Sequence, residues 1–231
     1  MYYGNPVATS QQDVTNVWDS NYKSVLHLKE SSPGTAATWR DSSSNANHNA
    51  TVPSGQAPNQ TTGIVGSGQD FIAATDDYIA FDPVTSFGNL NGNQTISFWY
   101  KTSANPGALT FMHALYNSGF TDATQTYFNG SGSVGTGSTY DSPFTYYTST
   151  TPPTATIWRY VTYTWNGSTS TFYIDGKRVA SSSTAPFASS AISVLFLGAE
   201  CSSTTNCDNF NGQMDETRYA ITGRSSDWVA T

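Results

Sequence analysis

Two dipeptides, Asn166-Gly167 and Asp175-Gly176, most constrain how this chain can fold. Each lies between runs in which apolar and polar residues alternate. Asn-Gly and Asp-Gly tolerate the positive φ angles of tight two-residue hairpin turns, and a period of two is the pattern of a strand with one buried face. Residues 157–181 are therefore predicted to form a three-stranded antiparallel meander.

Similar strand patterns recur along most of the remaining chain. They are rich in Val, Ile, Tyr, Phe, Trp and Thr, and clusters of Gly, Pro, Asn or Ser separate them. The further predicted strands are residues 24–30, 77–82, 94–102, 108–116, 124–129, 191–200 and 212–221. An open antiparallel set of this size normally splits, so we predict an all-β sandwich of two antiparallel sheets. Only residues 225–230 are compatible with a short helical turn.

Composition excludes several classes of function. The 231 residues suit one large all-β domain, and the net charge is −7 with only nine Lys and Arg. Because no basic run exists, nucleic acid is not expected as a partner. Because no stretch is long and apolar enough to span a bilayer, we expect no membrane insertion.

The two cysteines, Cys201 and Cys207, are separated by five residues that are mostly Ser and Thr. This spacing suits a disulfide at a hairpin tip, whereas a zinc site would need a second pair of ligands. Together with the low lysine content, the predicted disulfide favours an exported protein.

Four segments of the sequence resemble laminin-G-like domains of the concanavalin A-like lectin/glucanase superfamily. They occur in the family's order and read GSGQDFIAATDDYIAF (66–81), QTISFWYKT (94–102), IWRYVTYTWNGSTSTFYIDGKRVASS (157–182) and FNGQMDETRYAITGRSSDW (210–228). The resemblance implies a concanavalin A-like jelly-roll sandwich over residues 18–231. Residues 1–17 resemble the end of a small β-domain or linker that precedes such modules in bacterial surface proteins. The chain is thus expected to be one domain of a larger bacterial protein, extracellular or at the cell surface.

The adjacent acids Asp215 and Glu216 raise the question of glycoside hydrolysis, which uses two carboxylates facing one groove. Adjacent strand residues point to opposite faces, so these two are not expected to share a groove. Hydrolases of this fold carry acids at alternate positions of a strand, and no such pattern occurs here. We therefore expect no catalytic residue and no enzyme, and we expect Glu216 to meet Arg218, two residues further on.

The resemblance also implies a structural Ca²⁺, because related jelly-roll domains often hold one between the last strand and the early loops. Asp215 and Asp41 match the family's positions, and Glu30 is a weaker third ligand. Ca²⁺ prefers six to eight oxygen ligands. The alternative is a buried Asp215 that is satisfied by backbone N–H groups.

The tryptophans divide into three groups by position. Trp99 and Trp158 lie at positions that belong to the core in this family, so both are interpreted as packing residues. Those near the ends of the chain are expected to hold the termini: Trp18, Trp39 and Trp228. Trp165 precedes the Asn-Gly turn and could be exposed.

Sugar binding requires aromatic faces for pyranose rings and planar polar groups for hydroxyls. The stretch 116–147 supplies both, and its candidate carbohydrate-binding residues are Tyr116, Asn117, Asp122, Tyr127, Asn129, Tyr140, Asp141, Tyr146 and Tyr147. The predicted function is non-catalytic binding of a polysaccharide or glycan. The alternatives are an adhesion or structural module with a protein partner or no ligand, and, less favoured, a glycoside hydrolase or polysaccharide lyase.

Overall fold

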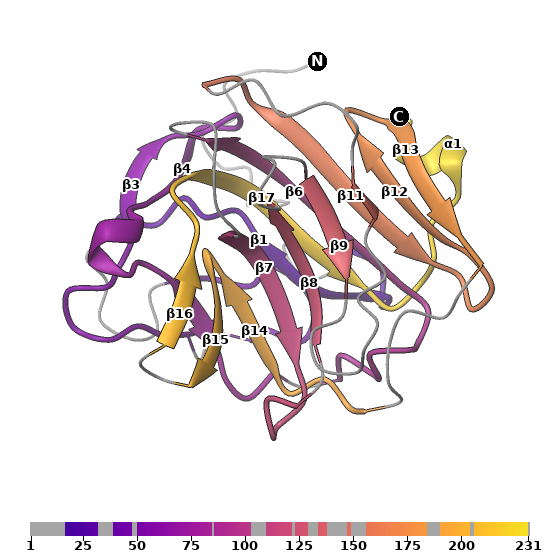
Figure 1. Cartoon of the computed structure of the whole chain (residues 1–231), viewed down its shortest axis with the longest axis horizontal. Coiled ribbons are helices and arrows are strands. Elements are labelled where there is room, and N and C mark those ends of the chain that lie inside the picture. The colour runs from indigo at the N-terminus through magenta and orange to yellow at the C-terminus, as the bar shows by residue number, and fades with distance from the viewer. Residues whose placement is uncertain are drawn as a thin grey trace, which may run out of the picture.

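The computed structural model describes residues 17–31, 39–47, 50–84, 86–102, 110–121, 123–128, 134–137, 147–148, 156–183, 190–203 and 206–230. These segments form two sheets that stack face to face, as the predicted sandwich requires (Figure 1). Two short helices complete the described part of the chain: η1 (Ala73–Thr75) and α1 (Ser226–Val229). None of the described helices is long and apolar enough to cross a membrane.

The first sheet has eight strands in the order β13-β12-β11-β6-β17-β4-β3, with β1 also paired to β17. Their bounds are β1 (Tyr22–Leu26), β3 (Asn59–Thr62), β4 (Ser67–Phe71), β6 (Gln94–Thr102), β11 (Arg159–Trp165), β12 (Ser170–Ile174), β13 (Lys177–Ser182) and β17 (Gly212–Ala220). The closing strand β17 therefore lies in the middle of this sheet and contacts β1, β4 and β6.

The second sheet has nine strands in the order β10-β9-β8-β7-β14-β5-β2, with the hairpin β15–β16 attached beside β7. Their bounds are β2 (Ala50–Thr51), β5 (Ile79–Phe81), β7 (Thr110–Tyr116), β8 (Ala123–Phe128), β9 (Val134–Gly137), β10 (Tyr147–Thr148), β14 (Val194–Leu197), β15 (Ala199–Ser203) and β16 (Asn206–Asn209). One pairing departs from the prediction of purely antiparallel sheets: β16 meets β7 in parallel, at Asn209 opposite Phe111.

The core lies between the sheets and takes alternate residues from each strand. In β6 these are Ile96, Phe98 and Tyr100, all at most 1% exposed. In β11 the matching residues are Val161 and Tyr163, which are fully buried. Because strand residues alternate between the two faces, the residues between them point away from the core.

The predicted meander is confirmed, with β11, β12 and β13 paired antiparallel in succession. Asp175 and Gly176 have φ angles of 51° and 73°, as the predicted two-residue turn requires. The Asn-Gly connection is longer than predicted: Trp165 pairs with Ser170, so residues 166–169 form the loop, in which Gly167 has a φ of 88°. The predicted disulfide is also present: Cys201 and Cys207 lie opposite each other in the β15–β16 hairpin.

Candidate functional site

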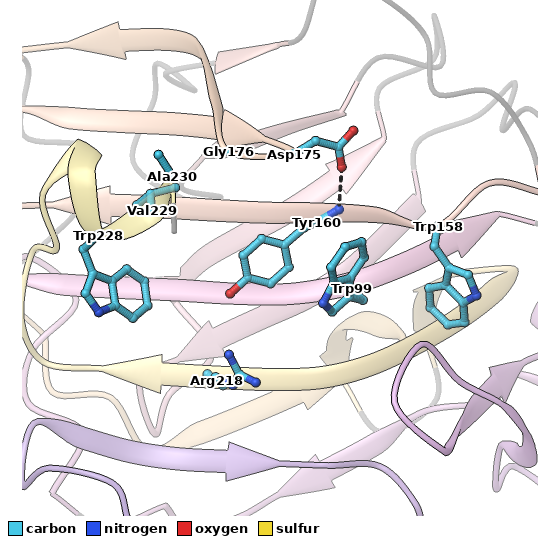
Figure 2. A pocket seen from close by; sticks show the side chains of 9 residues that line it. All are labelled: Trp99, Trp158, Tyr160, Asp175, Gly176, Arg218, Trp228, Val229 and Ala230. Carbon is cyan, nitrogen blue, oxygen red and sulfur yellow. Dashed lines mark hydrogen bonds between the residues drawn. The ribbon is translucent and has the colours of Figure 1, made fainter.

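A groove of about 640 Å³ lies on the outer face of the eight-stranded sheet (Figure 2). Strands β6, β11 and β17 form its floor, while the β12–β13 turn and the end of the chain at α1 lie along one side. Its lining residues are Trp99, Trp158, Tyr160, Asp175, Gly176, Arg218, Trp228, Val229 and Ala230.

The centre of the groove is an aromatic pair on neighbouring strands. Trp99 lies between the core residues Phe98 and Tyr100 of β6, so its indole faces outward. Tyr160 of β11 is its cross-strand partner, and their ring centroids are 5.1 Å apart at an angle of 39°. Cross-strand aromatic pairs of this kind hold each other in place, which gives the groove a preformed aromatic floor.

Two further tryptophans extend this floor into a row, in the order Trp228, Tyr160, Trp99, Trp158 (Figure 2). At one end, the ammonium of Lys101 lies 5.2 Å from the centre of the Trp158 ring. At the other end, the guanidinium of Arg224 lies 5.0 Å from the Trp228 ring. Cations over aromatic faces favour a fixed ring orientation, and all four rings are only partly buried.

The wall of the groove is the turn between β12 and β13. Its Asp175 carboxylate accepts hydrogen bonds from Arg159 Nη1 at 2.6 Å and from the backbone N–H of Tyr160 at 2.9 Å. A Cβ on Gly176 would lie 3.6 Å from the backbone of Val229 and Ala230, so the turn packs closely against the end of the chain.

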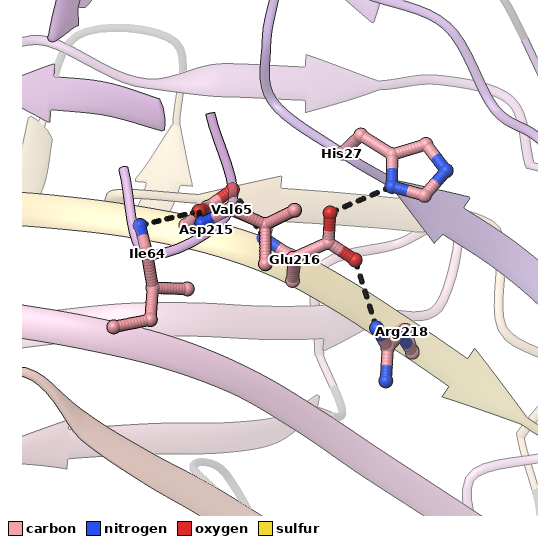
Figure 3. A network of polar contacts seen from close by, with 6 residues as sticks. All are labelled: His27, Ile64, Val65, Asp215, Glu216 and Arg218. Atoms are coloured by element: carbon pink, nitrogen blue, oxygen red, sulfur yellow. Dashed lines mark hydrogen bonds and ion pairs between the residues drawn. The ribbon is translucent and has the colours of Figure 1, made fainter. Parts of the chain in front are cut away.

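Arg218 of β17 lies on the opposite side of the aromatic row from Asp175 (Figure 2). Its Nη2 donates to Glu216 Oε2 at 2.8 Å, and its guanidinium stacks over the ring of Trp18 at 5.1 Å. Glu216 in turn binds His27 Nδ1 at 2.7 Å (Figure 3). Burial opposes ionisation of Glu216, but the contacts with His27 and Arg218 outweigh it and lower the pKa of this carboxyl.

This arrangement can bind a flat, partly apolar molecule and hydrogen-bond its polar groups. Asp175 is the one carboxylate among the lining residues, and it is already paired. The neighbouring Glu216 remains ionised in its ion pairs and so is not suited to donate a proton.

The interpretation of Trp99 and Trp158 as core packing was wrong, because both lie on the outer face and line the groove. Trp165, which could have been exposed, is 3% exposed and donates its indole N–H to the carbonyl of Asn91. Trp18 and Trp228 hold the ends of the described chain as expected, since both pack against the buried cluster formed by Tyr22, Val25 and Ala220.

The predicted carbohydrate-binding stretch does not supply an exposed aromatic surface in the described part. Tyr116 and Tyr127 are 0% and 1% exposed, so neither ring offers a face to a sugar. Asn117 is bonded to Thr121 through both ends of its amide. The remaining candidates lie outside the described residues or, for Tyr147 in β10, have no described side chain: Asp122, Asn129, Tyr140, Asp141, Tyr146 and Tyr147.

Tyr116 belongs to a buried polar cluster instead. Its hydroxyl donates to Glu200 and accepts a hydrogen bond from Gln125 Nε2 at 2.8 Å. Burial raises the pKa of Glu200, which is 8% exposed. These contacts assign Tyr116 a structural role in the nine-stranded sheet.

The three predicted calcium ligands are not brought together. Within the described residues, no three His, Cys, Asp or Glu side chains gather as a metal site would require. Asp41 accepts from the N–H groups of Val25, Ser43 and Asn47, and the Glu30 carboxylate accepts from the N–H of Arg40. The Asp41 oxygens are surrounded by donors and do not fit a cation, and the contact of Glu30 is likewise to an N–H group. These contacts do not support the Ca²⁺ prediction, which stays a prediction.

Asp215 is fully buried and bonded to backbone N–H groups. Its Oδ2 accepts from Ile64 at 2.8 Å and Val65 at 2.9 Å, and its Oδ1 accepts from Glu216 at 2.8 Å (Figure 3). Burial raises the pKa of this carboxyl more than these hydrogen bonds lower it. A bulge between Asp215 and Arg218, with a φ of 52° at Glu216, breaks the strict alternation that we predicted, yet the two acids still engage different partners.

Comparisons with known proteins place the fold. A family model of the concanavalin A-like lectin/glucanases superfamily matches residues 73–230. No curated protein sequence matches the chain.

Among solved structures, the chain is similar to the Trypanosoma rangeli sialidase in complex with sialic acid, with a TM-score of 0.69 and 14% identity over 93% of this chain and 33% of that chain. It is similar to the binding domain of Paraclostridial mosquitocidal protein 1, with a TM-score of 0.67 and 15% identity over 91% of this chain and 51% of that one. It is also similar to domain 4 of a GH43 extracellular arabinanase from Geobacillus stearothermophilus in complex with arabinotriose, with a TM-score of 0.59 and 14% identity over 75% of this chain and 80% of that one. The chain thus spans about half of the mosquitocidal structure and a third of the sialidase.

Proposed function

Because the chain belongs to the concanavalin A-like lectin/glucanases superfamily, we propose that it is a non-catalytic carbohydrate-binding module that holds a polysaccharide or glycan in the groove of the eight-stranded sheet. The superfamily's fold hosts both binding modules and enzymes, so the fold alone does not select this function. The observation that carries the proposal is the row of Trp228, Tyr160, Trp99 and Trp158 along one groove.

The physical reason is the match between this row and a sugar chain. A pyranose ring has an apolar face of C–H groups that stacks on an aromatic ring, and hydroxyls at its edge that need hydrogen-bonding partners. The aromatic floor supplies the stacking surface, while Asp175 on one side and Arg218 on the other supply the polar groups. Consecutive sugar rings can therefore rest on consecutive aromatic side chains, with their hydroxyls bonded at the walls.

Two observations from other proteins and from this chain are consistent with the proposal. The similar arabinanase domain was solved in complex with arabinotriose, so the same fold accommodates a sugar ligand in that protein. The disulfide and the lectin-like fold are consistent with an extracellular protein, and we place the module outside the cell or at its surface, as part of a larger chain.

The non-catalytic assignment rests on the acids around the groove. Two-carboxylate hydrolysis needs a protonated acid and a second free carboxylate on either side of one bond. The lining residues contribute Asp175 alone, which is held by Arg159. A glycan incubated with the protein is therefore expected to bind without release of new reducing ends.

The proposal is tested by a glycan array followed by titration of the best ligand against the wild type and single variants. Trp99→Ala and Trp158→Ala each remove one stacking ring, worth about 1 kcal/mol, and should weaken binding several-fold or more. Val179→Ala, at a side chain that is 38% exposed and outside the groove, is the control and should bind like the wild type.

Two outcomes would count against this site. Unchanged binding by both tryptophan variants, with loss on Tyr140→Ala or Tyr146→Ala, would move the site to the stretch expected from the sequence. No glycan bound at high concentration would favour an adhesion or structural module with a protein partner or no ligand.

A further inference from the structure

Two contacts fix the Arg218 side chain and leave one guanidinium nitrogen, Nη1, available to a ligand. Glu216 holds Nη2, and the ring of Trp18 supports the guanidinium plane. No described residue accepts a hydrogen bond from Nη1, although the side chain lines the groove. An arginine that is already fixed loses little side-chain entropy when it binds, which strengthens the bond it makes.

A second cation lies at the Trp158 end of the aromatic row. The Lys101 ammonium rests over the Trp158 ring, and no described carboxylate lies within ion-pair distance of it. Gln213 of β17 lies opposite Lys101 of β6 on one side and opposite Asp70 of β4 on the other. The backbones of Lys101 and Asp70 are therefore two strand spacings apart, or about 10 Å. Lys101 therefore has no ion pair among the described residues, although its charge partly offsets the rise that burial causes in the pKa of Asp70.

The two carboxylates in contact with the polar walls of the groove are both engaged with cations. Asp175 is paired with Arg159, and Glu216 is paired with both His27 and Arg218. Two cationic donors along the aromatic row nevertheless have no described acceptor: Nη1 of Arg218 in the groove and the Lys101 ammonium at the Trp158 end. An anionic group of a ligand can therefore form charge-assisted hydrogen bonds at these two places.

We infer that the groove selects acidic glycans, in which the sugar rings carry carboxylate or sulfate groups. The rings stack on the aromatic row while an anionic substituent binds Arg218, and a second one further along the polymer approaches Lys101. This inference rests on the proposed function, because it names the class of glycan that the same groove prefers. Arginine pairs with carboxylate and sulfate oxygens through charge-assisted hydrogen bonds, which are about twice as strong as neutral ones.

The test compares polymers that differ only in charge. Polygalacturonate is titrated beside its fully methyl-esterified form, and dextran sulfate beside dextran, while an array of acidic and neutral glycans covers other backbones. We expect each acidic polymer that binds to exceed its neutral counterpart about tenfold or more in affinity, and the excess to shrink as salt is added. Binding of polygalacturonate without dextran sulfate would identify the ring carboxylate as the group recognised, and binding of both would identify charge.

Single substitutions test which cations cause the preference for acidic polymers. Arg218→Gln should lower the affinity for the acidic polymer about tenfold, and Lys101→Gln, which breaks no ion pair, should lower it by a smaller factor. Lys101→Gln should leave binding of neutral glycans unchanged, because Lys101 does not line the groove, whereas Arg218→Gln also removes a donor to sugar hydroxyls and should weaken neutral binding by a smaller factor than acidic binding. Arg40→Gln makes the same change at an exposed position outside the groove and should have no effect.

Different results would overturn the preference for acidic glycans and the proposed function itself. Equal binding of acidic and neutral glycans, or unchanged acidic binding in Lys101→Gln and Arg218→Gln, would overturn the preference for acidic glycans and leave the proposed function standing. Absence of binding to every polymer and to the whole array would overturn both.

Discussion

His113 is a titratable residue that is fully buried in the core. Its side chain is 0% exposed, and its ring stacks on Phe98 with centroids 6.0 Å apart. Burial penalises the charged imidazolium and lowers the pKa of His113 to about 3, far below the 6.5 of a free histidine. The residue is therefore neutral in the folded protein and has no place in the binding groove.

This burial predicts a pH-dependent stability. Between these two pKa values the unfolded chain binds a proton that the folded protein does not, so stability falls as the pH is lowered from about 6.5 towards 3. In His113→Phe this contribution is removed. On going from about pH 6 to about pH 4, the wild type should lose about 2–3 kcal/mol more of its unfolding free energy than the variant. Denaturant unfolding at each pH measures the difference, and a difference that does not change with pH would refute this role of burial.

At the scale of elements, one side chain of β17 fixes this strand to the β3–β4 hairpin of the same sheet. The Asp215 carboxylate binds the backbone of the loop between β3 and β4 at Ile64 and Val65. The loop approaches so closely that a Cβ on Gly63 would collide with Asp215 Oδ2. The strand that carries Arg218 into the groove is thereby fixed to the early part of the chain.

Asp215→Asn should be markedly destabilising. The amide retains one acceptor oxygen and turns an NH₂ group towards backbone N–H donors, so at least one buried N–H loses its partner, at a cost of about 2–3 kcal/mol. Asp19→Asn is the matched control, because Asp19 is half exposed and forms a surface ion pair with Arg224, which contributes about 1 kcal/mol or less.

Asp215→Asn also tests whether the Asp215 carboxylate holds a calcium ion. If N–H groups alone hold Asp215, the destabilisation caused by Asp215→Asn will be the same with and without EDTA in thermal unfolding. A destabilisation that disappears in EDTA would show that this carboxylate holds a cation.

At the scale of the whole molecule, the longer strands were predictable, whereas the groove and the shorter strands were not. The strands missed are β2, β3, β4, β9, β10 and β16. The bounds of β6 match the predicted 94–102, because an uninterrupted run of β-formers between turn residues needs no tertiary information. The Asp175-Gly176 turn was predictable for the same local reason. Both signals are local in the sequence.

The groove depends on segments that meet only in the folded chain. Trp99, Asp175 and Trp228 come from β6, from the β12–β13 turn and from α1, and no spacing in the sequence places them together. One signal could have corrected Trp99: Phe98 and Tyr100 on either side are both apolar, so alternation alone would have placed Trp99 outside. The resemblance to the family indicated a core position instead, and for Trp99 that indication was wrong.

The burial of Tyr116 and Tyr127 had no such local signal. Strands β7 and β8 are buried at every described position but one, so both faces of this pair are covered and alternation does not separate exposed from buried tyrosines. Composition in this stretch therefore suggested a sugar-binding surface that the described residues do not provide.

The most direct test of the groove uses the indole N–H signals of the six tryptophans in NMR spectra, assigned with single Trp→Phe variants. During titration with a glycan that binds, the account predicts shifts at Trp99, Trp158 and Trp228, which line the groove. Trp39 and Trp165, which are 1% and 3% exposed, should keep their positions. Binding that leaves the three groove signals unchanged would contradict the account and place the ligand elsewhere on the molecule.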